Sequence, residues 1–253
     1  MIINCDWHIH SCVSPCASLE MSPSAIVKKL QEKNIQLAAL TDHNTTKNCP
    51  AFAVLCKKAH IAALYGMELQ TSEEIHVLCL FSNLQTAMKF GERINTIIPF
   101  FQNKPEKYGD QVYVDENDNI LGEINKYLQV SASLSIDDTA LLVHGLGGLC
   151  IPAHVNRSAF SMTSQLGSVV PGEWDALEVM DIPPTYVLSS NLSTKVPLDT
   201  LGYPLITSSD AHYLNDIAKR FFNLEIGYNS LYHENGTVNL NTIRRSLKLR
   251  PTK

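Results

Sequence analysis

The sequence predicts an α/β fold formed by a single domain of 253 residues. Three observations predict it. Short apolar runs alternate with segments of helical periodicity, the length and the 45% hydrophobic content suit one sizeable core, and histidine or carboxylate residues repeatedly stand where an apolar run ends. Strand–helix alternation is typical of a mostly parallel sheet. In α/β barrels the functional site lies at the carboxyl ends of the strands, which is where these polar residues fall.

The N-terminal third alternates strands and helices from its first residues. Ile2 and Ile3 begin an apolar strand that leads into the sequence Asp6-Trp7-His8-Ile9-His10. Ser22 followed by Pro23 is typical of a helix start, because serine caps the first amides and proline suits the first turn. The elements predicted after this point are the helix up to Asn34, a strand over Gln36–Leu40, a helix over Cys49–Ala59, and strands over Ile61–Tyr65 and Ile75–Phe81.

The alternation breaks down over residues of about 83–130, which we interpret as an insertion rather than a separate domain, and as a candidate lid or substrate wall. Ala87–Ile98 has helical periodicity, and Gln111–Leu121 is predicted to form a hairpin. Asp115 and the two asparagines after it have the spacing of a calcium loop. The glycine such a loop requires is replaced by Ile120, so a polar turn is the better interpretation.

The alternation resumes after residue 130. Ser135 is predicted to cap a helix that runs through His144, and Asn239–Leu249 is predicted as a closing helix with basic residues in its last turns. The strands predicted in this part are Leu149–Ala153, Ala176–Met180, Leu205–Ser208 and Phe221–Ile226.

Composition excludes several classes of protein. The net charge of −5 gives no global attraction to nucleic acid or to an anionic membrane, and no apolar run reaches the length of a transmembrane helix. The N-terminus has no basic region before its first strand, so we expect no signal peptide. Seven cysteines, an odd number without CxxC pairs, indicate reduced thiols in a cytoplasmic protein.

Histidines at strand ends give the first chemical signal. His8 and His10 are two residues apart, and in an extended strand such side chains point to the same side, where they can chelate one ion. Similar motifs end other apolar runs: Thr41-Asp42-His43-Asn44, Gly66-Met67-Glu68, Glu74-Ile75-His76-Val77, Ile151-Pro152-Ala153-His154 and Ser209-Asp210-Ala211-His212. Several nitrogen and oxygen donors without thiolate suit zinc, manganese or iron.

In their order, these motifs resemble the PHP (polymerase and histidinol phosphatase) metallohydrolases. The resemblance runs from Asp6 to His212, and the variant with Cys12, Cys16 and Cys49 is similar to stand-alone PHP phosphoesterases rather than to polymerase domains. It implies a distorted (β/α)7 TIM-like barrel with an inserted segment, with residues 1–253 as one PHP metallohydrolase domain.

The resemblance also implies two to three divalent metal ions, zinc, manganese or iron. The ligand sets it implies are His8, His10, Glu68 and Asp210 for one ion, Glu68, His76 and His154 for a second, and His43 with His212 for a third. Glu68 would bridge two ions, since a carboxylate has two oxygens. Glu68 and Asp210 would then position a metal-bound hydroxide for attack on phosphorus.

One departure concerns the third ion. The family pattern has an aspartate shortly after the first histidine pair, and here Pro15 stands in its place. We therefore expect the third site to be weak, absent, or completed by substrate or solvent. Cys12, Cys16 or Cys49 could supply a thiolate, but buried or incidental thiols are the better interpretation, because no helix or base is evident to activate them.

Other polar residues beside these motifs have expected roles in orientation or substrate binding. Asp42 points away from His43 on an extended strand, and Asp6 lies behind the first histidine pair, so both are expected to orient neighbours rather than bind metal. Arg157 is the candidate phosphate fork, with an ordinary surface arginine as the equal alternative. Asn44 and Asn156 are weaker candidates for hydrogen bonds to substrate.

The predicted function is a metal-dependent phosphoesterase acting on a small phosphorylated metabolite or nucleotide. Nucleic acid is expected only as a substrate, in the alternative of an exonuclease-type phosphodiesterase, and no membrane partner is expected. A metal-dependent amidohydrolase is a second alternative, because the same nucleophile can attack a carbonyl carbon. A non-catalytic binding barrel is a third, and the nearly complete set of ligand positions argues against it.

Overall fold

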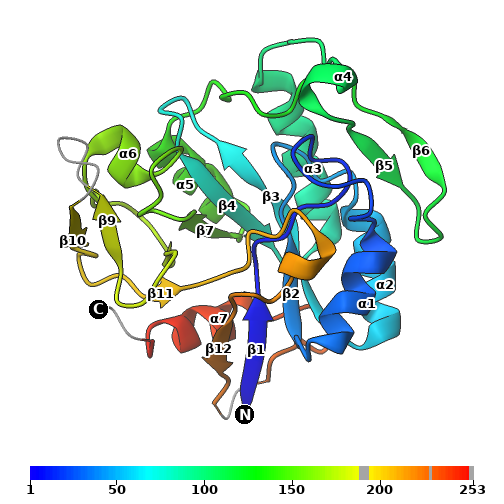
Figure 1. The fold of residues 1–253 in the computed structure, drawn as a ribbon. Coiled ribbons are helices and arrows are strands. Elements are labelled where there is room, and N and C mark those ends of the chain that lie inside the picture. Colours follow the sequence, from blue (N-terminus) through cyan, green and yellow to red (C-terminus); the bar gives the residue numbers. More distant parts are fainter. Residues whose placement is uncertain (188–193, 228–229, 251–253) are drawn as a thin grey trace.

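The computed structural model describes residues 1–187, 194–227 and 230–250. Strands and helices alternate along the chain, which confirms the α/β prediction (Figure 1). The strands are β1 (Ile2–Asp6), β2 (Leu37–Leu40), β3 (Ala62–Gln70), β4 (His76–Phe81), β5 (Val112–Val114), β6 (Ile120–Glu123), β7 (Leu149–Pro152), β8 (Leu177–Glu178), β9 (Thr185–Val187), β10 (Lys195–Pro197), β11 (Leu205–Ile206) and β12 (Phe222–Glu225). The helices are α1 (Pro23–Glu32), α2 (Cys49–Ala59), α3 (Leu84–Ile97), α4 (Pro105–Tyr108), α5 (Ile136–Gly145), α6 (Met162–Leu166) and α7 (Leu240–Leu247), with a 3-10 turn η1 (Leu214–Asp216).

One six-stranded sheet forms the framework, in the order β12-β1-β2-β3-β4-β7. It is mixed rather than mostly parallel, so that prediction is wrong. β1, β2 and β3 run parallel, but β4 is antiparallel to both of its neighbours and β12 is antiparallel to β1. Only residues 71–75 join β3 to β4, which is too few for a crossover, so the chain must turn back.

The turn back at residues 71–75 has a direct consequence for the site. It pairs His76, the first residue of β4, with Gln70, the last residue of β3. His76 therefore lies at the same edge of the sheet as the carboxyl end of β3. Gly66 allows the two strands to approach closely here, since a Cβ at this position would lie 1.8 Å from the main-chain oxygen of Cys79.

The short parallel pair β8–β11 lies between β7 and the continuation of β1. On one side, Val155 donates its N–H to the carbonyl oxygen of Glu178 at 2.8 Å. On the other side, His10 donates its N–H to the carbonyl oxygen of Ala211 at 3.0 Å. The sheet therefore curves so that β7 and β1 approach each other through β8 and β11. That the barrel has seven strands stays a prediction.

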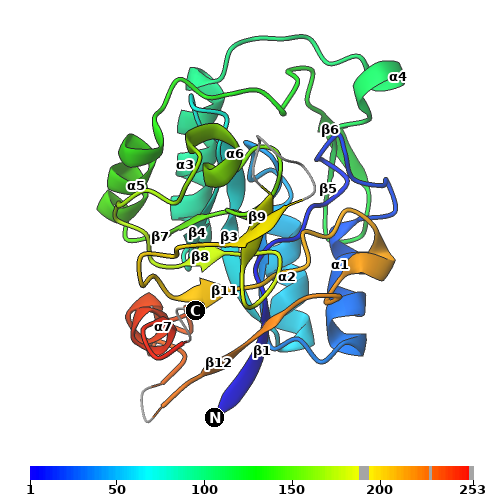
Figure 2. The same ribbon diagram turned by 60° about the vertical axis from the view of Figure 1, so that its left-hand side comes forward.

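Alternate residues of the strands enter different cores, as the period of two requires. In β2, Leu37 and Ala39 face the core enclosed by the curved sheet, while Ala38 and Leu40 face α1 and α2. The enclosed core also contains residues of β12 and α7, which lie at the opposite end of the molecule from α4 (Figure 2). A third core packs α3 and α5 against the outer face of β4 and β7. Burying each large apolar side chain contributes roughly 1.5–3 kcal/mol.

The helix starts and the hairpin follow the sequence signals. The hydroxyl groups of Ser22 and Ser135 accept the N–H groups of Ala25 and Asp138, so both predicted serine caps are confirmed. The predicted hairpin is formed by β5 and β6. Asp115 Oδ1 accepts two main-chain N–H groups of the turn, at 2.8 and 2.9 Å, as expected for a polar turn.

Partly buried polar contacts fix the C-terminal helix to the sheet. Asp175 Oδ1 accepts a hydrogen bond from Arg244 Nε of α7 at 2.8 Å, and Asp175 Oδ2 accepts the N–H of Cys150 in β7 at 2.9 Å. His144 Nε2 of α5 also lies 2.9 Å from Asp175 Oδ2. One carboxylate thus connects α7 to α5 and β7, which lie about 90 residues earlier in the sequence. Among the described residues, none of the helices has both the length and the apolar character needed to cross a bilayer.

Candidate metal centre

The eight side chains predicted as metal ligands lie in one cluster. Each stands at or near the end of a strand: His8 and His10 follow β1, His43 follows β2, Glu68 is in β3, His76 begins β4, His154 follows β7, and Asp210 and His212 follow β11. Six of them are buried. Asp210 and His212 keep 14% and 23% of their side-chain surface exposed, so the cluster opens to solvent on their side.

The carboxylate of Glu68 lies at the centre of the cluster, in contact with five imidazoles. Its Oε1 lies 3.2 Å from His8 Nε2, 2.8 Å from His76 Nδ1 and 2.9 Å from His154 Nε2. Its Oε2 lies 3.1 Å from His43 Nδ1 and 3.3 Å from His10 Nε2. These five histidines come from four different strand ends, so the contacts depend on the tertiary fold.

The donor atoms form three overlapping groups, each with its atoms within 4.8 Å of one another. They are His8, His10, Glu68 and Asp210; His43, Glu68 and His76; and His10, His43 and His212. The first group has the membership predicted for the first ion. The second contains His43 where His154 was predicted, although His154 also contacts Glu68.

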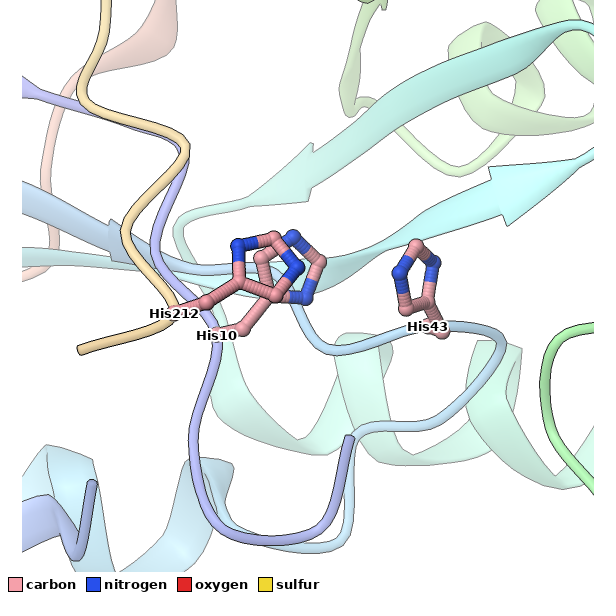
Figure 3. Close-up of side chains that lie close together, drawn as sticks. All are labelled: His10, His43 and His212. Atoms are coloured by element: carbon pink, nitrogen blue, oxygen red, sulfur yellow. The ribbon is translucent and has the colours of Figure 1, made fainter. Parts of the chain in front are cut away.

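The third group consists of imidazoles alone (Figure 3). The His10 ring lies between the other two, with its centroid 4.3 Å from that of His212 and 4.5 Å from that of His43. The sequence led us to expect only His43 and His212 here. His10 therefore gives this group a third nitrogen donor in the absence of the family's aspartate.

These residues fit metal ions better than a hydrogen-bonded core. A carboxylate offers about four lone-pair sites, and five imidazole nitrogens approach that of Glu68. His8 Nε2 and His10 Nε2 also lie 3.1 Å apart, and His154 Nδ1 is buried with no hydrogen-bond partner among the described residues. Divalent cations satisfy converging nitrogen and carboxylate donors of this kind.

The electrostatics of the cluster favour the forms that bind cations. Burial opposes ionisation of Glu68, but the surrounding histidines, His76 foremost, hold the pKa of its carboxyl group well below its usual value. Burial lowers the pKa of His43 well below its usual value and, with the charge of His10, lowers that of His212 to about 4. Neutral imidazoles and ionised carboxylates are the protonation states of metal ligands.

His8 and His10 behave in the opposite way. Burial alone would lower their pKa values, but neighbouring carboxylates raise that of His8 well above its usual value and that of His10 to about 9. The carboxylates responsible are Glu178, Glu68 and Asp210 for His8, and Asp210 and Glu68 for His10. Cations bound at these donors would replace protons, so metal binding would be coupled to proton release.

Ser14 occupies the turn where the aspartate is missing, directly before Pro15. Its hydroxyl group donates to Asp42 Oδ1 at 2.7 Å and lies 3.1 Å from His10 Nδ1. Asp42 also accepts the N–H and the hydroxyl of Ser11, at 2.6 and 2.7 Å. Asp42 therefore faces away from the donor groups and holds the turn that orients His10.

The cysteines contribute no donor to the three groups found among the described residues. The thiol of Cys12 lies 3.5 Å from the carbonyl oxygen of Val112, and that of Cys49 lies 3.7 Å from the carbonyl oxygen of Gly66. Burial raises the pKa of the Cys12 thiol to about 12 and raises those of Cys16 and Cys49 further. Protonated thiols are poor metal ligands.

Of the three residues predicted to bind substrate, one lies at the open side of the cluster and two bind main-chain groups. Arg157 Nη1 lies 3.3 Å from Asp210 Oδ2, and its side chain is 43% exposed, so it stands at the open side of the cluster. Asn156 instead donates to the carbonyl oxygen of Thr185 and accepts the N–H of Met180. Asn44 donates to two carbonyl groups, of Leu128 and Val130. The two asparagines thus join chain segments.

Three residues at or beside the cluster have a strained backbone. His154 and Asp210 have positive φ angles of 31° and 52°, and Asn44, which follows His43, has 50°. This region is costly for residues other than glycine and persists only where the surroundings enforce it. Strained donors of this kind are typical of functional sites.

Glu178 is a buried residue that the sequence analysis missed. Its two carboxylate oxygens lie 2.9 and 3.1 Å from His8 Nδ1, and it accepts the N–H of His154 at 2.9 Å. A carboxylate on one ring nitrogen fixes the tautomer and directs the other nitrogen at the metal. The only signal in the sequence was a glutamate inside an apolar run, Ala176–Met180.

Replacing Glu178 with alanine is expected to weaken zinc binding by about 10- to 100-fold, because His8 loses the partner that orients it. Glu178→Gln, which can still accept the Nδ1–H of His8, is expected to lose less. Competition titration with a chelator measures both affinities, and Glu225→Ala, an exposed residue of β12, serves as the control. Equal zinc affinity in Glu178→Ala and the wild type would remove this role.

The PHP domain family model matches residues 6–140 of the chain. A search of curated protein sequences found no significant match.

Among solved structures, endonuclease Q from Pyrococcus furiosus has a TM-score of 0.63 at 18% identity over 98% of this chain. The same values hold for endonuclease Q bound to a 27-mer duplex with an abasic lesion. A proposed metal-dependent phosphoesterase from Bifidobacterium adolescentis has a TM-score of 0.55 at 17% identity, over 96% of this chain and 95% of that one. The present chain spans 56% of the endonuclease Q chain, and likeness at these identities establishes the fold alone.

Proposed function

Because this chain belongs to the PHP domain family of metal-dependent hydrolases, we propose that it hydrolyses a phosphoester of a small phosphorylated metabolite or nucleotide. The proposed cofactors are two to three divalent ions, zinc, manganese or iron. The proposed ligands are the eight residues of the cluster: His8, His10, His43, Glu68, His76, His154, Asp210 and His212.

One observation carries this proposal: a single buried carboxylate contacts five imidazoles from four different strand ends. A structural core has no need of such a group, because burying ionisable residues costs free energy that apolar packing avoids. Two oxygens on Glu68, each facing its own set of nitrogens, suit a carboxylate that bridges two cations.

The ions, when bound, would supply Lewis-acid chemistry, lowering the pKa of water and neutralising charge on phosphoryl oxygens. The protein residues would do the rest. Glu68 and Asp210 would help to hold the cations, because both belong to the first donor group. Arg157, at the open side beside Asp210, would orient the phosphate through its guanidinium group.

We also propose a domain organisation for the whole chain. Residues 1–253 would form one PHP domain, with β8 and β11 completing a distorted seven-stranded barrel around the enclosed core. The segment of about 83–130, which contains α4 and the β5–β6 hairpin, would be an insertion that forms one wall of the site. All seven cysteines are free thiols, which supports a reducing, cytoplasmic location.

Phosphate release from a substrate screen tests the proposed function. Protein reconstituted with zinc, manganese or iron(II) is expected to release phosphate from a phosphomonoester, or to cleave a cyclic nucleotide or short oligonucleotide, and to stop on chelation. Failure to hydrolyse any phosphoester with each metal would contradict the proposal. Release of amines from amide substrates instead would assign amidohydrolase activity.

An exonuclease-type activity is the second candidate. Endonuclease Q, whose fold this chain shares, has been seen bound to a DNA duplex. The oligonucleotide arm of the screen separates the two candidates. An exonuclease would turn over an oligonucleotide faster than a phosphomonoester, measured per molecule of metal-loaded protein.

Arg157→Ala is expected to raise KM for a phosphorylated substrate by about 10- to 100-fold, the loss of a charge-assisted hydrogen-bonded contact of roughly 1.5–3 kcal/mol. Bound metal is expected to stay near the wild-type amount, because the guanidinium group is not a metal ligand. Arg93→Ala, an exposed arginine of α3, is the matched control. Parallel losses of metal and substrate binding would instead give Arg157 a structural role.

A further inference from the structure

Phe160 places an exposed aromatic ring beside the cluster. It lies between β7 and α6, and its ring stacks on that of His76, with centroids 4.9 Å apart and an interplanar angle of 13°. The carbonyl oxygen of Phe160 also accepts the N–H of His76 at 3.1 Å. His76 covers one face of the ring, yet the residue is 38% exposed. Part of this residue therefore stays open to solvent although its ring is stacked on a buried histidine.

The conformation of Phe160 is strained. Its φ angle is 53°, in a region where a bulky residue is a genuine outlier. Such a backbone conformation costs free energy and persists only where the surrounding structure enforces it. Hydrogen bonds on both sides hold the segment in place: Arg157 donates its N–H to the carbonyl oxygen of His154, and Ser161 donates its hydroxyl to that of Arg157. Burial does not explain this arrangement, because it leaves an apolar ring in solvent.

The same segment also carries Arg157, which contacts a different residue of the cluster. Arg157 reaches Asp210, whereas Phe160 covers His76. Both contacted residues belong to the cluster that centres on Glu68. An aromatic ring thus follows Arg157 by three residues, and each of the two side chains contacts a member of the cluster.

We infer that Phe160 binds a planar heteroaromatic ring of the substrate by stacking, so that the preferred phosphoesters are nucleotides. This inference rests on the proposed function, because it requires a phosphate group at the cluster. Stacking of a base on an aromatic side chain changes affinity by about ten- to a hundredfold. It is tolerant of base identity, since every base has a π-face.

AMP and ribose 5-phosphate form the matched pair of probes, since they differ by the base. Calorimetry on the zinc-loaded protein is expected to show AMP binding about ten- to a hundredfold more tightly than ribose 5-phosphate. Phe160→Leu is expected to bring the two affinities within about threefold of each other, whereas Phe160→Tyr restores the preference. Phe100→Leu, which alters an exposed ring of another segment, is expected to keep it.

A second readout uses fluorescence in place of calorimetry. In Phe160→Trp, AMP is expected to quench the fluorescence of the introduced side chain, and ribose 5-phosphate is not. Zinc content is measured in every variant. If Phe160→Leu loses zinc, the test rests on Phe160→Tyr and Phe160→Trp, which keep an aromatic ring at this position.

Two failures are distinguishable. If phosphoesters are hydrolysed but the AMP preference is absent, or is unchanged in Phe160→Leu, the inference about Phe160 is overturned and the proposed function stands. If neither probe binds the zinc-loaded protein and no phosphoester is hydrolysed, the proposed function fails and takes this inference with it.

Discussion

Replacing Glu68 with glutamine is expected to lower phosphoester turnover by at least about a thousandfold, or roughly 4 kcal/mol of transition-state stabilisation. Glutamine has nearly the same shape, but it is neutral and turns an N–H₂ group toward one set of ring nitrogens. The two sides of the cluster would then lose their shared negative charge. Bound metal should fall with turnover, and elemental analysis measures it.

The matched control for Glu68→Gln is Glu225→Gln, the same change at an exposed position of β12. It should leave both metal content and turnover at wild-type values. Full activity in Glu68→Gln, or full metal content without activity, would show that the carboxylate does not hold the ions.

Zinc or manganese is expected to raise the thermal midpoint of unfolding by roughly 5–10 °C for each site filled at a hundredfold excess over Kd. The reason is mass action: a ligand that binds only the folded chain at this excess contributes about 2.7 kcal/mol. For a domain of this size 1 kcal/mol corresponds to roughly 2–4 °C. Thermal unfolding with and without chelator measures the difference.

In His8→Ala, which lacks a donor of the first group, the shift should fall by about the contribution of one site, whereas Arg157→Ala should keep the full shift. An equal shift in the wild type and His8→Ala would place the stabilising ions elsewhere on the protein.

Much of the site could be predicted from sequence because local rules govern it. His8 and His10 share a side of an extended strand, and each further motif follows an apolar run, so the fold class alone brings their ends together. The structure places the side chains of all eight of these residues in one cluster. The division of donors among the three groups was less predictable, because His10 and His43 each belong to two groups.

Direction of the strands depended on a short connection that carries no turn signal. Residues 71–75 contain neither glycine nor proline, and β3 continues four residues past Gly66, so Glu68 lies inside a strand rather than after it. The antiparallel return of β4 then brings His76 to Glu68. Hydrophobic periodicity records which face is buried but not which way a strand runs.

Two residues escaped sequence analysis for a tertiary reason. Glu178 belongs to a strand of two residues and meets His8 across 170 positions of sequence. Phe160 belongs to no strand, and its importance lies in its φ angle and its stacking on His76. Neither property is encoded in a local pattern of residue types.

The central claim is that divalent ions bind where the donors meet, and anomalous diffraction from crystals soaked in zinc tests it most directly. We predict peaks at the zinc edge within coordination distance of both oxygens of Glu68, one of them shared with His8 and Asp210. Peaks confined to other parts of the surface, with none at Glu68, would contradict the account.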